Sequence, residues 1–472
     1  MPTTQLTAMR KILSTLLLST LVISSFTGCL RTKDPVTTTV VPEVTLTFYG
    51  LFDNEDVYTP FIDAYQKSHT NVTILYKKYT DPDAYLSLIV NELAEGEGPD
   101  IFMLHNTWFP GNYKKLTPAP ASEITPEIFR SSFVDVTSDD LIIPDSTNAE
   151  QVWGIPLYVD TLALYYNDAH FEDALTAQGK PSTTWDGIKN DVTLLNRQDQ
   201  SFERFERSGI ALGRSDNILR AFDILMMMML DYKVNFYSDD LTQATFANDP
   251  NALKALELFT SFGLPSQKNY SWNKYLADAD SSEKELTTFA KGKLSMLFGY
   301  SYTYNDILTE VNRLKQEDQE TIDVDDVKIQ EAPQAFDPAT SAETRKAYAS
   351  YFVPVVSRTS VNSDYAWDFL LSMTNTSLLE GYNAVTHRPS ALRSLITDEM
   401  KDPIYGVFAA QVGYAHSIPM VYPSDYKAVF MDGVDQILST SAAQDVLRNL
   451  ADQIQNLIPS GGVKPIYVPT TE

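Results

Sequence analysis

The stretch "VTLTFYG" (Val44–Gly50) alternates apolar with hydroxylated or small side chains and is rich in β-branched residues, which predicts a β-strand. Further strands are predicted at "NVTILYKKY" (Asn71–Tyr79) and at "PDIFMLHN" (Pro99–Asn106), an apolar run that suits a strand buried on both faces. Helical patterns separate them, one expected to begin at Thr59-Pro60 and one expected to span Asp81–Gly96. This strand–helix–strand order predicts a parallel α/β sheet.

The loops after the first and third predicted strands are candidates for ligand contacts. In parallel α/β sheets, ligands gather beyond the carboxyl ends of the strands. The first loop contains Phe52 and Asp53, and the other contains Asn106 and Trp108. Asp53 could instead cap the helix that follows it, and Trp108 could instead pack beneath its own loop.

The N-terminal 28 residues are typical of a secretory signal. Arg10 and Lys11 precede the apolar stretch Ile12–Phe26, which is shorter than the about 20 residues that a membrane helix needs. The stretch ends in "FTGC", which resembles the lipobox of bacterial lipoproteins, with Phe where Leu is usual. The resemblance implies that Cys29 is acylated and anchors the chain to the outer face of the cell membrane, with residues 29–43 as a flexible tether. An ordinary cleaved signal with an incidental cysteine is the alternative.

The composition excludes several classes of partner. Removing residues 1–28, whose only charges are Arg10 and Lys11, moves the formal net charge from −26 to −28. A surface this acidic should repel nucleic acids and anionic lipid headgroups. Because Cys29 is the single cysteine, no disulfide framework or thiolate metal site is possible in the body. We expect a monomer of two domains without cofactor or metal.

Four motifs occur in an order and approximate spacing that resembles the extracellular solute-binding proteins of sugar-type ABC importers, the group that includes maltodextrin-binding proteins. These motifs are "GPDIFMLHNTWFPGNYKKL", "VWGIPLYVDTLALYYNDAHFEDA", "TTWDGIKN" and "FAKGKLSMLFGYSYTYNDI". The resemblance implies a two-lobed periplasmic-binding-protein fold of type II, with a mostly parallel sheet flanked by helices in each lobe. The ligand cleft is then expected at a hinge of several chain crossings.

The resemblance also implies how the chain divides between the lobes. The expected N-terminal lobe takes residues 44–154 plus 289–333, and the expected C-terminal lobe takes residues 155–288 plus 334–472. Crossings are then expected near Gly154, near Thr288 and within residues 334–343.

Carried over to matching positions, the resemblance implies ligand contacts at the four loop residues above and at five later positions. These five are Tyr158 and Asp160 after the first expected crossing, Tyr300 and Tyr302 in "GYSYTY", and Arg388 in "HRP". The family reads "GPW" where this chain has Gly-Tyr-Ser-Tyr, so the ring that stacks on a sugar is expected to be Tyr300 or Tyr302. Arg388 could donate a fork of hydrogen bonds to ring hydroxyls or to an acidic sugar, or it could form a surface salt bridge.

The expected function is capture of a small solute, a carbohydrate by resemblance, through lobe closure and its delivery to the permease subunits of an ABC transporter. The same fold could bind a polyamine, a peptide or a metal ion, or it could serve as a sensor or surface binding protein. A secreted glycoside hydrolase, which needs two suitably spaced carboxylates, is the remote alternative. The sequence contains no G-x-S-x-G elbow, no H-E-x-x-H and no P-loop, so we expect no enzymatic activity.

Overall fold

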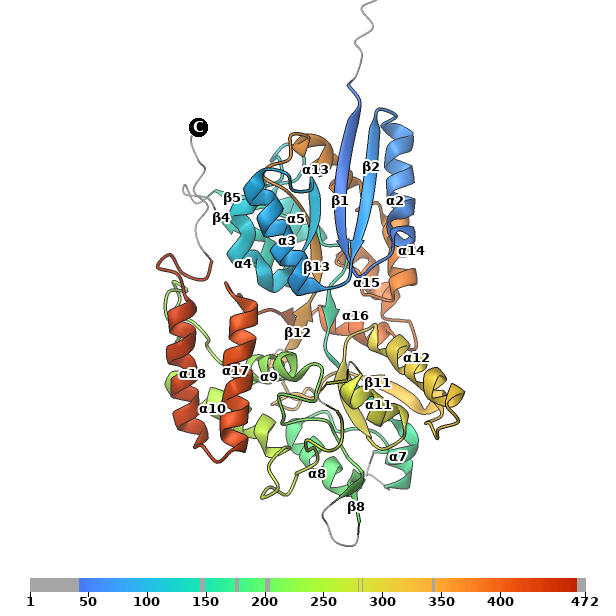
Figure 1. Cartoon of the computed structure of the whole chain (residues 1–472), viewed down its shortest axis with the longest axis vertical. Helices are drawn as coiled ribbons and strands as arrows, with labels where there is room; N and C mark the ends of the chain where they lie inside the picture. Colours follow the sequence, from blue (N-terminus) through green and yellow to red (C-terminus); the bar gives the residue numbers. More distant parts are fainter. Residues whose placement is uncertain are drawn as a thin grey trace, which may run out of the picture. The chain divides into compact units, whose positions relative to one another are not determined.

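The computed structural model describes residues 42–144, 149–174, 178–199, 204–278, 280–281, 283–341 and 344–464. The chain from Val44 onward forms one compact unit (Figure 1). Cys29, the predicted signal and most of the predicted tether lie outside the described residues. Within the described ranges, every helix is too short or too polar to span a membrane.

Two hydrophobic cores divide this unit into two lobes. The first lobe contains β1 (Val44–Leu51), α2 (Glu55–Ser68), β2 (Val72–Tyr79), α3 (Pro82–Glu95), β3 (Ile101–His105), α4 (Phe109–Asn112), α5 (Pro126–Ser132), α6 (Asp135–Leu141), β4 (Ile142–Pro144), β5 (Glu150–Val152), β13 (Phe352–Val356), α13 (Ser363–Ser372), α14 (Thr376–Thr386) and α15 (Arg393–Glu399).

The main sheet of the first lobe has the strand order β13-β3-β1-β2. Strand β1 pairs in parallel with β2 and β3, as the sequence predicts, and β13 joins the other side of β3 in the antiparallel direction. The predicted cap of α3 is confirmed, because the Asp81 carboxylate accepts hydrogen bonds from two backbone N–H groups and Gly96 ends the helix at φ +79°. The predicted start of α2 at Thr59-Pro60 is wrong: the helix begins one turn earlier, and Pro60 lies inside it.

The second lobe is built mainly from the middle and the end of the chain. It contains β6 (Asp160–Thr161), β7 (Ala163–Asn167), α7 (Asp168–Asp173), α8 (Trp185–Leu195), β8 (Arg197–Gln198), β9 (Phe205–Arg207), α9 (Ala221–Asp231), α10 (Pro250–Ser261), α11 (Lys284–Ala290), β10 (Met296–Gly299), α12 (Thr303–Gln316), β11 (Val327–Gln330), β12 (Ala347–Ser350), α16 (Gly406–Val412), β14 (Ala415–His416), α17 (Pro423–Leu438) and α18 (Ala443–Leu457). Strands β10 and β11 both pair antiparallel with β7, so the mostly parallel pairing expected for each lobe is found in the first lobe only.

Two of the expected chain assignments are wrong. Residues 289–333 belong to the second lobe, because β10 and β11 pair with β7 and their apolar side chains enter the second core. The segment from Phe352 through α15 belongs instead to the first lobe, because β13 pairs with β3 along its whole length. An apolar strand can complete either sheet, and the sequence around it does not reveal which one it joins.

The chain crosses between the cores near Val159, near Ser350 and between α15 and α16. At the first two crossings, β6 and β12 pair antiparallel, with Ser350 opposite Asp160, and β14 pairs with β12 on its other side. The crossings expected near Thr288 and within residues 334–343 are wrong, since Thr288 and the described residues 334–341 lie within the second lobe. The crossing expected near Gly154 occurs a few residues later.

Candidate ligand-binding site

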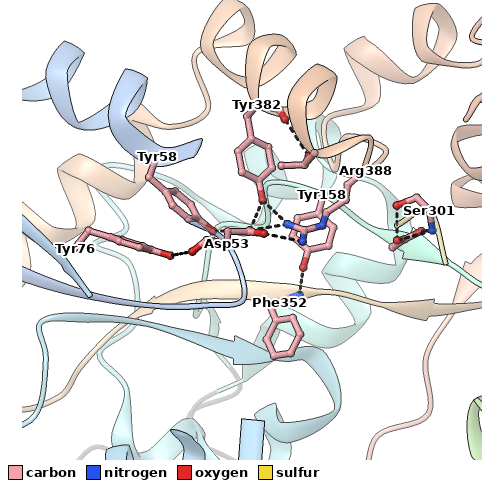
Figure 2. A network of polar contacts seen from close by, with 10 residues as sticks. Asp53, Tyr58, Tyr76, Tyr158, Ser301, Phe352, Tyr382 and Arg388 are labelled. Atoms are coloured by element: carbon pink, nitrogen blue, oxygen red, sulfur yellow. Dashed lines mark hydrogen bonds and ion pairs between the residues drawn. The ribbon is translucent and has the colours of Figure 1, made fainter. Parts of the chain in front are cut away.

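Asp53 and Arg388 form a nearly buried, two-pronged ion pair in the first lobe (Figure 2). Arg388 Nη1 donates to Asp53 Oδ2 at 2.6 Å, and Nη2 donates to Oδ1 at 2.8 Å. The Arg388 side chain is 14% exposed and the Asp53 side chain is 12% exposed. Asp53 does not cap α2, because Asn54 occupies the N-cap position. The fork predicted for Arg388 therefore exists, but a carboxylate of the protein fills it.

Four tyrosines surround this ion pair. The Tyr58 hydroxyl donates to Asp53 Oδ2 at 3.2 Å, and the Tyr76 hydroxyl donates to the Asp53 backbone carbonyl at 2.8 Å (Figure 2). Arg388 Nη1 also donates to the Tyr382 hydroxyl at 3.1 Å, and its guanidinium carbon lies 4.6 Å from the centre of the Tyr158 ring. Burial raises the pKa of Tyr58 and Tyr382, so both hydroxyls keep their protons. The network fixes the loop that follows β1.

Next to this network, aromatic rings from three segments of the first lobe form a group that we call the aromatic platform: Phe52, His105, Trp108 and Phe352. Phe352 contacts the other three edge-on, with ring centres 4.8–5.8 Å apart. Phe52 has a φ of +69° and is 43% exposed. A left-handed backbone at a large aromatic residue is uncommon and costs free energy. Such strained residues are often found at functional sites.

His105 lies at the end of β3 and is held by both ring nitrogens. Nδ1 lies 2.8 Å from Thr107 Oγ1, and Nε2 lies 3.0 Å from Ser350 Oγ. Burial and the nearby charge of Arg220 lower the pKa of His105 to about 3, so the ring is neutral at physiological pH. It therefore adds a polar but uncharged edge to the platform.

In the second lobe, Tyr300 and Tyr302 stack with ring centres 5.9 Å apart. Tyr300 is 2% exposed and donates to Asp223 Oδ2 at 3.0 Å, whereas Tyr302 is only partly buried. The Arg220 guanidinium carbon lies 5.4 Å and 5.6 Å from the two ring centres, and Arg220 Nη2 donates to the Tyr302 hydroxyl. Of the two predicted stacking rings, Tyr302 is therefore the one with surface available.

Asp160 connects the two groups at the chain crossings. Its carboxylate accepts from the backbone N–H of Ser301 at 3.0 Å and from the Ser301 hydroxyl at 2.7 Å (Figure 2). Burial raises the pKa of Asp160 to about 6. Ser350, which pairs with Asp160 in the sheet, also contacts His105 of the platform. This chain of contacts brings the platform and the tyrosine pair to the same crossing strands.

Asn106 lies apart from these surfaces. It is 3% exposed, donates to Asp140 Oδ2 at 3.3 Å and accepts from the backbone N–H of Tyr351 at 3.4 Å. Tyr351 also donates to Asp140, at 2.7 Å. The amide thus belongs to a buried network that joins β3 to the second crossing.

The structure thus gathers Phe52 and Trp108 on one surface, Tyr300 and Tyr302 on another, and Asp160 between them. Sequence reasoning missed His105, Phe352 and Arg220. His105 lies at the carboxyl end of the third predicted strand, and the rule that ligands gather at such strand ends, which selected Asn106, could also have selected His105. No local signal marks Phe352 or Arg220. Among the described residues, no group of three or more His, Cys, Asp or Glu side chains is arranged to hold a metal ion.

The chain thus forms two α/β lobes that are joined by these crossings, and aromatic and polar side chains of both lobes lie beside them. This is the fold of the two-lobed solute-binding proteins. The family model described as "Bacterial extracellular solute-binding protein" matches residues 53–370. The chain belongs to this family, as the sequence motifs predict.

Solved structures of similar fold include three sugar-binding or solute-binding proteins. They are a cyclic alpha-maltosyl-1,6-maltose binding protein from Arthrobacter globiformis (17% identity, 88% of this chain and 99% of that chain covered, TM-score 0.68), the sugar-binding protein MalE from Xanthomonas citri (14%, 88% and 97%, 0.69) and an ABC transporter solute-binding protein from Thermotoga lettingae bound with alpha-D-tagatose (17%, 88% and 100%, 0.64). At these identities the likeness shows the fold alone. No curated protein sequence matches the chain.

Proposed function

We propose that the protein captures a sugar between the aromatic platform and the Tyr302 surface. The observation that carries this proposal is that exposed and partly exposed aromatic rings of the platform lie at the same chain crossings as the partly exposed Tyr302 and Arg220 of the other lobe. Flat rings cover the C–H face of a pyranose, and polar groups satisfy its hydroxyls, which are costly to bury unpaired. The sugar ligands named for several proteins of similar fold support the same ligand class.

Binding works through lobe closure in this proposal. A ligand that contacts both lobes has a higher affinity for the closed form, and it shifts the population toward that form by this difference. The sugar leaves the site chemically unchanged. The closed protein then delivers it to the permease subunits of an ABC transporter.

The proposed site of action is outside the cytoplasm, with the chain anchored to the membrane by an acylated Cys29. Several acyl chains would hold the protein, since each buried CH₂ contributes about 0.8 kcal/mol. In cells that express Cys29→Ala, the protein should move from the membrane fraction to the soluble fraction. The unaltered chain is the control, and retention of the variant in membranes would argue against the anchor.

Binding can be tested by a thermal-shift screen of mono- and oligosaccharides on the body from Val44 onward. A sugar at 100 times its dissociation constant should stabilise the folded state by about 2.7 kcal/mol. Tyr302→Ala should weaken binding of that sugar, because the Tyr302 ring has free surface. Tyr300→Ala should chiefly lower the free energy of unfolding, because its ring is buried.

The outcomes of the screen separate the alternatives. Response to a polyamine, a peptide or a metal ion, with no response to any sugar, would refute sugar capture. Unchanged sugar affinity in Tyr302→Ala would exclude that ring from the site. Conversion of the sugar to a product during incubation would contradict a binding role.

A further inference from the structure

Arg220 carries a guanidinium group whose donors are mostly free. Within the described residues, its hydrogen bonding consists of the Nη2 contact to the Tyr302 hydroxyl, and its one ion pair, with Asp223 Oδ2, measures 4.0 Å. By contrast, Arg214, Arg313 and Arg388 each make two or more hydrogen bonds to carboxylates at 2.6–2.8 Å. A guanidinium group has five N–H donors arranged as a planar fork. Arg220 can therefore still accommodate an anionic acceptor.

Arg220 lies where a ligand of the proposed site would meet it. It occupies the N-cap position of α9, and its side chain is 41% exposed. Its guanidinium group lies over the Tyr300 and Tyr302 rings. Contacts of Ser301 with Asp160 and of Ser350 with His105 join this tyrosine pair to the platform through the crossing strands. The group therefore stands on the Tyr302 surface, one of the two surfaces between which we propose that the sugar binds.

The carboxylates around Arg220 do not neutralise it closely. Asp223 already accepts from Tyr300 and also feels the charge of Lys427. Both oxygens of Glu285 accept from the backbone N–H of Leu219, and burial raises the pKa of Glu285 to about 7. Burial raises the pKa of Asp306, and the nearby charge of Arg220 offsets only part of this increase.

We propose that the captured sugar carries an anionic group, as a uronate does, and that Arg220 binds this group with a charge-assisted fork of hydrogen bonds. The proposal rests on the proposed capture of a sugar and specifies its class. A planar carboxylate matches the guanidinium fork in shape, and such hydrogen bonds are roughly twice as strong as those between neutral groups. The hydroxyls of a neutral sugar would bring Arg220 no opposite charge beyond the 4.0 Å ion pair with Asp223.

The test compares matched neutral and acidic sugars by titration calorimetry. Glucose, galactose and mannose, with their oligomers, are paired with glucuronate, galacturonate and mannuronate and their oligomers, and sulfated sugars form a separate arm. The unaltered protein should bind its best acidic sugar at least about tenfold more tightly than the matching neutral one. This preference should fall as ionic strength rises. Preferential binding of uronates or of sulfated sugars supports the proposal and distinguishes the two anionic groups.

Two variants then assign the preference to Arg220. Arg220→Gln should reduce the acidic-over-neutral preference at least about tenfold, whereas Arg220→Lys should retain part of it. Arg313→Gln, which removes an arginine already paired with Glu310 and Glu317, should leave it unchanged. A neutral sugar bound as tightly as its acidic partner would overturn this inference and leave sugar capture intact. Binding of neither class by the unaltered protein would refute sugar capture itself.

Discussion

Replacing Arg388 by methionine should lower the free energy of unfolding by about 3–5 kcal/mol. The variant would leave the Asp53 carboxylate, which is 12% exposed, without its cation among buried tyrosine rings. Breaking one half of a buried ion pair is costly because the remaining charge has lost both its water and its partner. The quantity can be measured by urea denaturation, with intrinsic fluorescence as the signal.

Two comparisons identify the cause of this loss. The matched control Arg393→Met removes an exposed arginine whose partner, Asp135, is 82% exposed, and it should change the free energy by less than about 1 kcal/mol. The double variant Asp53→Leu with Arg388→Met should lose less than the sum of the single variants, because no charge is then stranded. If Arg388→Met is as stable as the Arg393→Met control, the pair does not hold the loop after β1.

Replacing Gly111 by alanine should weaken ligand binding roughly 5- to 150-fold, which corresponds to about 1–3 kcal/mol of steric strain. Gly111 lies in α4 of the first lobe, and a Cβ atom there would stand 2.4 Å from the backbone carbonyl oxygen of Val421 in the second lobe. A backbone atom cannot rotate aside as a side chain can, so the lobes would have to separate at this point. A ligand that needs contact with both lobes would then bind less tightly.

The affinity should be measured by titration with the sugar that emerges from the screen. Gly381→Ala is the matched control, because Gly381 lies on the exposed side of α14 and a Cβ there would have no neighbour within 4 Å. That variant should bind the sugar as the unaltered protein does. Equal affinity of Gly111→Ala would mean that the liganded form does not need the approach of these two segments.

Much of the first lobe could be predicted from local sequence. Strand alternation in "VTLTFYG" and the cap and stop residues Asp81 and Gly96 are properties of short segments, and the structure confirms them. The Met226–Met229 run lies in an apolar helical segment and is at most 1% exposed, so its burial also follows from local sequence. Four motifs in order were sufficient to identify the family.

The sequence by itself thus determined the local elements, the family and most of the residues beside the crossings. The tertiary structure alone decided which lobe β10 and β13 complete, because an apolar strand pairs with whichever sheet edge lies beside it. It also decided that, in the described part of the chain, the donors of Arg388 are occupied and that most donors of Arg220 are not. Asp53, 335 positions from Arg388 in the sequence, fills the fork of Arg388, whereas most donors of Arg220 stay free among the described residues. The charge state of a buried site depends on which groups folding brings together. Groups that are far apart in the sequence can meet there, so their contact cannot be read from the sequence.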